Sequence, residues 1–270
     1  MQPARFEIEP FFLDAEHGAL FCIHLYPTLI PSKGGILYLH PFAEEMHKSR
    51  RMAAQQARRF ASEGYTVLQV DLTGCGDSGG DFADAGWQTW LNDARRAHAW
   101  LSSRTTGQIR LWGLRTGASL AVELATALPD IEQLLLWQPV VNGEQYLNQF
   151  LRIKLASEML SQGQAQTGTK ALRARLDAGE SVEVGGYSLN GAMARDLARL
   201  KLAELRPPCP VLWLEVGMKD GDLPCPASQR IVDSWRKSGV NVATRTVAGE
   251  PFWVTQEISE CPALIEATTP

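Results

Sequence analysis

Short, continuous apolar runs alternate with amphipathic segments along most of this chain. The runs are as long as strands and contain few polar residues, which is typical of strands buried on both faces of a sheet. They lie at residues 34–42, 65–72, 108–113, 131–141 and 209–217. The intervening segments predict helices at about 48–62, 85–102 and 228–238, and one that ends near Leu128. This alternation predicts an α/β fold, a mostly parallel sheet covered by helices on both faces.

The pattern changes near the N-terminus and again in the second half of the chain. Residues 5–13 and 18–27 flank a turn-like segment and read as an antiparallel pair that opens the sheet. Residues 142–207 are helical, polar and irregular, and 161–170 and 182–191 read as loops. We therefore expect a core formed by residues 1–141 and 208–270, with an inserted helical cap at 142–207.

Composition narrows the class of protein. The formal net charge is −4, so no basic surface suggests binding to nucleic acid. No apolar run approaches the roughly 20 residues of a membrane span, and the N-terminus lacks the pattern of a signal peptide. The cysteines are odd in number and widely spaced, which favours reduced thiols. They are Cys22, Cys75, Cys209, Cys225 and Cys261. We expect a cytoplasmic protein without a membrane span, a bound metal or another cofactor.

One turn has the shape of a catalytic motif without its nucleophile. Residues 111–121, LWGLRTGASLA, place an apolar run before G-x-x-x-G and a helix-forming run after it. In the nucleophile elbow this turn reads G-x-S-x-G, and the serine attacks the substrate. Here Arg115 stands at the serine position. A guanidinium stays protonated and cannot act as a nucleophile.

Several other segments, together with this turn, resemble the α/β-hydrolase fold. They are LHPF at 39–42, DLTGCGDSGG at 71–80, GLRTG at 113–117, VGMKDGDLPCP at 216–226 and AGEPFW at 248–253. Residues 40–65, 74–97 and 111–118 are also similar to the second hydrolase-like family associated with exosortase A. That resemblance implies a bacterial protein of the exosortase and exopolysaccharide system, with no established reaction.

The resemblance also implies positions for a Ser-acid-His triad. Asp220 matches the acid, whereas Glu250 and Pro251 stand where the histidine usually follows the last strand. The histidines all precede the elbow, at His17, His24, His40, His47 and His98. Two of the three triad members are therefore missing, which argues against a conventional serine-hydrolase mechanism.

The electrostatic part of such a site is retained. The N–H groups of Thr116, at the start of a helix, and of Phe42, after the third strand, are expected to face the pocket. Arg115 would add a bidentate donor for a carboxylate or phosphate. The candidate pocket comprises Arg115, Thr116, Phe42, His40, Glu45, Asp220 and Trp253. Alternatively, Arg115 is a buried structural arginine paired with Glu44 or Glu45, and nothing binds.

Other nucleophiles are weaker candidates. Cys75 and His40 follow neighbouring strands, so a thiolate–imidazole pair is a further hypothesis. Ser78 lies in a turn, where serine commonly braces the loop. No His, Asp or Glu cluster has the spacing of a metal site.

Three functions remain open at this point. The first is an anion-binding pseudo-hydrolase anchored at Arg115. The second is a divergent enzyme that acts on an acyl or glycosyl substrate of envelope polymers without a triad. The third is a scaffold whose cap contacts another protein of the exosortase or exopolysaccharide system.

Overall fold

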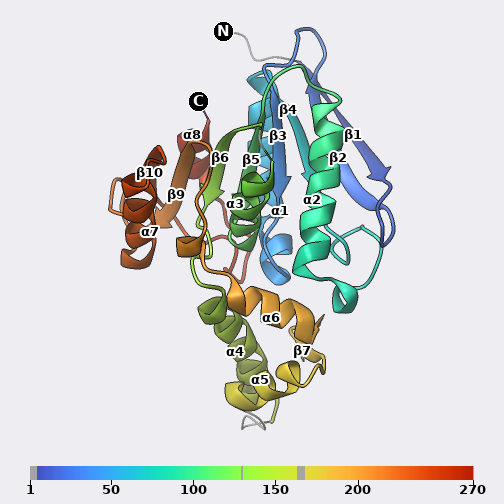
Figure 1. Cartoon of the computed structure of the whole chain (residues 1–270), viewed down its shortest axis with the longest axis vertical. Helices are drawn as coiled ribbons and strands as arrows, with labels where there is room; N and C mark the ends of the chain where they lie inside the picture. Colours follow the sequence, from blue (N-terminus) through green and yellow to red (C-terminus); the bar gives the residue numbers. More distant parts are fainter. Residues whose placement is uncertain (1–4, 129, 163–167, 270) are drawn as a thin grey trace.

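An eight-stranded sheet forms the centre of the computed structural model, which describes residues 5–128, 130–162 and 168–269. Its strand order is β1-β2-β4-β3-β5-β6-β9-β10 (Figure 1). The strands are β1 (Phe6–Leu13), β2 (Leu20–Pro27), β3 (Gly35–Leu39), β4 (Thr66–Val70), β5 (Ile109–Leu114), β6 (Ile131–Trp137), β9 (Val211–Gly217) and β10 (Val242–Ala248). β1 pairs antiparallel with β2, and β2 with β4, whereas all other neighbours are parallel.

Helices cover both faces of the sheet, which confirms the predicted α/β architecture. α1 (Glu44–Ser62) and α8 (Pro262–Thr268) pack on one face. α2 (Trp87–Ser102), α3 (Thr116–Ala127) and α7 (Pro226–Lys237) belong to the apolar cluster of the other face. Successive residues of a strand point to opposite faces, so Leu37 and Leu39 join the second cluster while Ile36 and Tyr38 join the first. Burial on both sides explains why these strands read as continuous apolar runs.

The segment between β6 and β9 forms the insertion at the lower end of Figure 1. It contains α4 (Gly143–Gln162), α5 (Thr169–Asp177), β7 (Val182–Val184), β8 (Tyr187–Leu189) and α6 (Gly191–Arg199), followed by a short 3-10 turn (Leu202–Glu204). Its buried side chains, among them Leu147, Leu176 and Leu197, continue the apolar cluster under α2 and α3. The insertion therefore packs against the edge of the sheet where the parallel strands end.

Two local features differ from the sequence expectations. Residues 182–189 form a β-hairpin instead of a loop, and Val184 pairs with Tyr187 across two glycines of positive φ, Gly185 and Gly186. Such a two-residue turn matches the twist of a hairpin. α1 begins at Glu44, four residues before the predicted start at Lys48. Two acidic residues in the first turn suit the positive end of the helix dipole. Of the predicted loop 161–170, residues 163–167 lie outside the described residues.

Candidate functional site

The elbow retains the sharp turn that its glycines predicted. Arg115 connects β5 to α3 with φ 56° and ψ −117°, a conformation that side-chain-bearing residues rarely adopt. A Cβ at Gly117 would overlap the carbonyl oxygens of Leu39 and His40. A Cβ at Gly113 would overlap the carbonyl of Gly117. The G-x-x-x-G spacing is thus required by close backbone approach at this turn.

Backbone strain is concentrated at this edge of the sheet. Among the described residues, the non-glycine positions with positive φ are Ala43, Arg115 and Gln138. They follow β3, β5 and β6, which are neighbours in the sheet. Strained residues of this kind cost about 1–3 kcal/mol each and gather at functional sites.

The Arg115 side chain lies between two aromatic rings and against one carboxylate. Its guanidinium carbon is 5.6 Å from the ring centroids of both Tyr146 and Trp253. Nε donates to Oε1 of Glu45 at 3.3 Å, and Nη1 donates to the carbonyl of Gln138 at 3.4 Å. No described residue accepts a hydrogen bond from Nη2, and this atom is absent from the buried unpaired groups. The edge of the guanidinium at Nη2 therefore has donors without a described protein partner.

Glu45 is the partner of Arg115, so the ion pair expected under the structural alternative is present. The Arg115 and Glu45 side chains are 17% and 13% exposed. The hydroxyl of Tyr146 donates to Oε2 of Glu45 at 3.1 Å. Burial raises the pKa of Glu45, and the charge of Arg115 and these hydrogen bonds oppose that shift. Glu44 instead accepts a hydrogen bond from the hydroxyl of Tyr187 at 3.3 Å.

A cavity of about 460 Å³ lies above this ion pair, between the core and the insertion. Its lining residues are Glu44, Glu45, Lys48, Arg115, Tyr146, Gln149, Phe150, Ile153, Val184, Gly185, Tyr187, Trp253 and Val254. The volume is in the range of small-molecule sites, and the walls combine aromatic rings with a few charged groups. The ion pair and the open pocket therefore coexist.

Two backbone N–H groups near the elbow also have no partner among the described residues. Within the described part of the chain, no hydrogen bond uses the N–H of Phe42 or of Thr116. Phe42 is fully buried, with its ring against Trp90 and Phe150, and neither Phe42 nor Thr116 is among the residues that line the cavity. The Thr116 hydroxyl is buried without a partner. These donors are the ones that the hydrolase resemblance implied for an oxyanion hole.

The loop after β10 brings Trp253 to the cavity, whereas the loop after β9 does not bring Asp220 there. Trp253 is 5% exposed and contacts Arg115 from the segment where a triad histidine was expected. Asp220 is exposed and is not one of the cavity-lining residues. Its Oδ1 accepts the N–H of Ala248 at 2.7 Å, so the carboxylate caps the end of β10.

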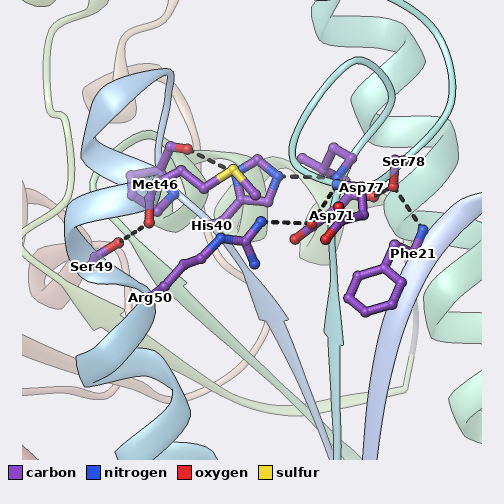
Figure 2. Close-up of polar contacts among 10 residues, drawn as sticks. Phe21, His40, Met46, Ser49, Arg50, Asp71, Asp77 and Ser78 are labelled. Carbon is purple, nitrogen blue, oxygen red and sulfur yellow. Dashed lines mark hydrogen bonds and ion pairs between the residues drawn. The ribbon is translucent and has the colours of Figure 1, made fainter. Parts of the chain in front are cut away.

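His40 lies in a separate polar cluster, with both ring nitrogens bonded to backbone (Figure 2). Nδ1 donates to the carbonyl of Pro41 at 2.7 Å, and Nε2 accepts the N–H of Leu72 at 3.1 Å. Burial lowers the pKa of His40 and raises that of the Cys75 thiol. A neutral, fully bonded imidazole and a protonated thiol do not form the thiolate–imidazole pair.

The rest of this cluster braces the loop after β4 (Figure 2). Oδ2 of Asp71 accepts from Nη2 of Arg50 at 2.7 Å and from the N–H of Asp77 at 3.2 Å. The Ser78 hydroxyl donates to the carbonyl of Asp71 at 2.5 Å and accepts the N–H of Phe21 at 2.8 Å. Ser78 thus links this loop to β2, consistent with the bracing role expected for it.

Sequence reasoning missed the cavity residues contributed by the insertion. Tyr146 and Phe150 are four residues apart on α4, and Tyr187 begins β8. The four-residue spacing places two aromatic rings on one helix face, but it does not show what that face meets. Lys48, where the sequence predicts the start of a helix, also lines the cavity, and its Nζ donates to the carbonyl of Thr255 at 2.6 Å.

We also searched the described residues for groups that could hold a metal ion and for helices that could span a membrane. Among residues 5–128, 130–162 and 168–269, no three His, Cys, Asp or Glu side chains are grouped so as to hold a metal ion. None of the helices in these ranges is long and apolar enough to cross a membrane.

Comparison with solved structures shows that the chain has the α/β-hydrolase fold. It is similar to Est1E from Butyrivibrio proteoclasticus, in a structure with ferulic acid bound, at 16% identity and a TM-score of 0.70 over 96% of each chain. A putative hydrolase from Agrobacterium vitis S4 is 19% identical, with a TM-score of 0.61 over 98% of this chain and 97% of that one. XC6422 from Xanthomonas campestris, described as an α/β serine hydrolase without a lid, is 15% identical, with a TM-score of 0.59 over 97% and 92% of the chains. Identities this low establish the fold alone.

Sequence comparison gives the family. No curated protein matches the chain. A model of the X-Pro dipeptidyl-peptidase (S15) family matches residues 33–200, which is more than half of the sequence. This range includes the elbow, the His40 cluster and most of the insertion. The chain belongs to the X-Pro dipeptidyl-peptidase (S15) family and has the α/β-hydrolase fold.

Proposed function

We propose that this protein binds a carboxylate-bearing ligand at Arg115 and does not use the elbow for hydrolysis. The observation that carries the proposal is the free edge of the guanidinium. Nη2 has no partner among the described residues, and Arg115 lines a cavity of about 460 Å³. Because Nη2 is neither buried nor bonded to a described protein group, it can donate to a ligand in this cavity.

The chemistry of the elbow argues against the peptidase reaction in the family's name. An arginine cannot attack a carbonyl, and no histidine follows position 98 to act as general base. Trp253 contacts Arg115 from the segment expected to supply that base. Asp220, the remaining candidate triad member, is hydrogen-bonded to the end of β10. The site therefore keeps a group that can bind an anion, but it lacks the nucleophile and the general base that hydrolysis needs.

The same groups favour a singly charged carboxylate over other ligands. A carboxylate, that of Glu45, already contacts this guanidinium from inside the protein. Because Glu44 and Glu45 line the same cavity, a dianion such as phosphate would be repelled more strongly than a monoanion.

The cellular setting rests on the sequence resemblance. Residues 40–65, 74–97 and 111–118 are similar to the hydrolase-like family associated with exosortase A. We therefore place the binding function in the bacterial exosortase and exopolysaccharide system, where the ligand would be an envelope precursor or a related acid.

The test compares Arg115, which follows β5, with Arg110, which lies on that strand. Arg115→Met removes the proposed anchor. Arg110→Met removes an arginine that is also paired with a carboxylate, Glu132, and stacked on a ring, Tyr65, but that does not line the cavity. Calorimetric titration with acetate, benzoate and ferulic acid should give binding in the wild type and in Arg110→Met, and at least a tenfold weaker affinity in Arg115→Met.

Two results would contradict the proposal. One is equal affinity for these acids in Arg115→Met and Arg110→Met, which would place their binding elsewhere. The other is ester or peptide hydrolysis by the wild type that Arg115→Met abolishes, which would favour a divergent enzyme over a binding protein.

A further inference from the structure

The cavity is lined by charged groups near the elbow and by apolar side chains at its mouth. At the elbow, the polar groups are the guanidinium of Arg115 and the carboxylate of Glu45. At the mouth, Ile153 on α4 and Val254 after β10 line the cavity and are 49% and 55% exposed. The other charged lining residues are already bonded, Lys48 to the carbonyl of Thr255 and Glu44 to the hydroxyl of Tyr187. A ligand that fills this cavity therefore has a charged end and an apolar end.

The apolar side of the mouth continues along α4. Tyr146, Phe150 and Ile153 line the cavity from this helix at spacings of four and three residues. The same helix face extends to Leu160, seven residues beyond Ile153, which is 90% exposed. Met159, next to Leu160, is 58% exposed, and Ala156, between Ile153 and Met159, is exposed as well. This α4 stripe, residues 153, 156, 159 and 160, extends about 10 Å from the cavity mouth.

We infer that the ligand is a single-chain monocarboxylate amphiphile whose apolar chain leaves the cavity along the α4 stripe. The inference rests on the proposed carboxylate site at Arg115. Two observations support this occupant over a protein partner. The stripe is continuous with the wall of a pocket that has a charged anchor at its base, and its residues follow the cavity-lining face of one helix. A flexible alkyl chain can follow such a narrow strip, whereas a stable protein interface needs a broad area of roughly 800 Å² on each side.

The experiment measures how affinity depends on chain length. Acetate, hexanoate, decanoate and myristate are titrated, below their micellar concentrations, into the wild type and four variants. Ile153→Ser and Leu160→Ser alter the stripe, and Arg115→Met removes the anchor. Leu223→Ser is the matched control, because Leu223 is 79% exposed and does not line this cavity.

The expected result is an affinity that rises with each added methylene, by up to about fourfold per group, until the chain reaches the end of the stripe. Ile153→Ser and Leu160→Ser should bind acetate as the wild type does but lose part of the gain for decanoate and myristate. Leu223→Ser should match the wild type for every acid. Dodecyl phosphate should bind more weakly than myristate, because of the acidic residues in the cavity.

The contrary results separate this inference from the proposed function. If acetate and myristate bind equally and both depend on Arg115, the carboxylate site stands and the amphiphile is excluded. If myristate binds equally well to Arg115→Met, the carboxylate site itself fails. Tighter binding of dodecyl phosphate than of myristate would overturn the choice of head group. A wild-type dimer in sedimentation that dissociates in Leu160→Ser would assign the stripe to a second copy and overturn the inference.

Discussion

Two polar clusters lie at the same edge of the sheet, and they differ in how fully their hydrogen bonds are used. Around His40, both ring nitrogens, the Asp71 carboxylate and the Ser78 hydroxyl are bonded to other protein groups. Around Arg115, one guanidinium nitrogen has no described partner, and a cavity of about 460 Å³ lies next to it. The first arrangement holds loops together, whereas the second has donors left for a ligand.

The comparison shows that residue type alone does not identify a site. His40 and Ser78 are typical catalytic residues, yet here they bond to backbone groups of neighbouring loops. Arg115 stands where a catalytic serine was expected and nevertheless occupies the pocket. A hydrogen-bond donor or acceptor that has no protein partner and lies beside a cavity is a more informative sign of a binding site.

The largest expected effect is on the stability of the protein, through the fully bonded cluster around His40. His40→Ala should lower the free energy of unfolding by about 3 kcal/mol, because it opens a cavity and leaves the buried N–H of Leu72 without a partner. Urea denaturation measures this change. Carboxylate affinity of the folded variant should stay close to that of the wild type. A stable His40→Ala protein that no longer binds carboxylates would show that His40 belongs to the binding site.

A smaller effect is expected from the competition between Glu45 and the ligand for Arg115. Burial raises the pKa of Glu45 above its ordinary value near 4.5, so its carboxylate gains a proton while an alkyl carboxylate is still ionised. Protonated Glu45 releases Arg115, and hexanoate affinity should rise several-fold as the pH falls from neutral through the raised pKa of Glu45. Calorimetric titration across this range measures the rise.

Glu45→Gln is the control for this pH dependence. Glutamine keeps the size of the side chain and can still accept from the Tyr146 hydroxyl, but it carries no titrating charge. Its affinity for hexanoate should be high throughout the range and nearly independent of pH. The free energy of unfolding depends on pH in the same direction. The stabilisation that comes from neutral Glu45 is fully present below a pH of about 4.5, and it is lost as the pH rises through the raised pKa of Glu45. A slope that persists in Glu45→Gln would assign it to another group.

The smallest effect concerns Cys75, where the structure predicts almost no reactivity. Burial raises the pKa of this thiol, and both nitrogens of His40 are bonded elsewhere. Iodoacetamide should modify the exposed Cys225 first and Cys75 slowly, as followed by peptide mass spectrometry. Rapid alkylation of Cys75 that His40→Asn slows would restore the thiolate–imidazole hypothesis.

Most of the core could be predicted from apolar runs. Strands buried on both faces, such as β3 and β5, read as continuous apolar segments because both neighbouring layers exclude water. The hairpin at 182–189 was also detectable, since Val-Glu-Val and Tyr-Ser-Leu alternate around Gly185 and Gly186. The start of α1 was harder to locate, because Ala43 provides no side-chain cap.

The candidate site was only partly predictable. Glu45 and Arg115 lie together because they follow β3 and β5, neighbouring parallel strands whose ends meet at one edge of the sheet. Trp253 follows β10, three strands farther along the sheet, and only the course of its loop brings it to Arg115. Asp220 follows β9 at that edge too, yet its loop turns it toward Ala248. Tyr146 and Tyr187 come from the insertion, whose position over the edge depends on packing between distant segments.

The sequence by itself determined the layered α/β core, the tight turn at 113–117 and the presence of a guanidinium in place of a nucleophile. These follow from local rules, namely burial patterns, the steric freedom of glycine and the fixed charge of arginine. Only the tertiary structure decided that Glu45 holds Arg115, that His40 is fully bonded and that a cavity remains open beneath α4. Those outcomes depend on which distant side chains meet, because hydrogen bonds and cavities are properties of packed neighbours and not of residues in order.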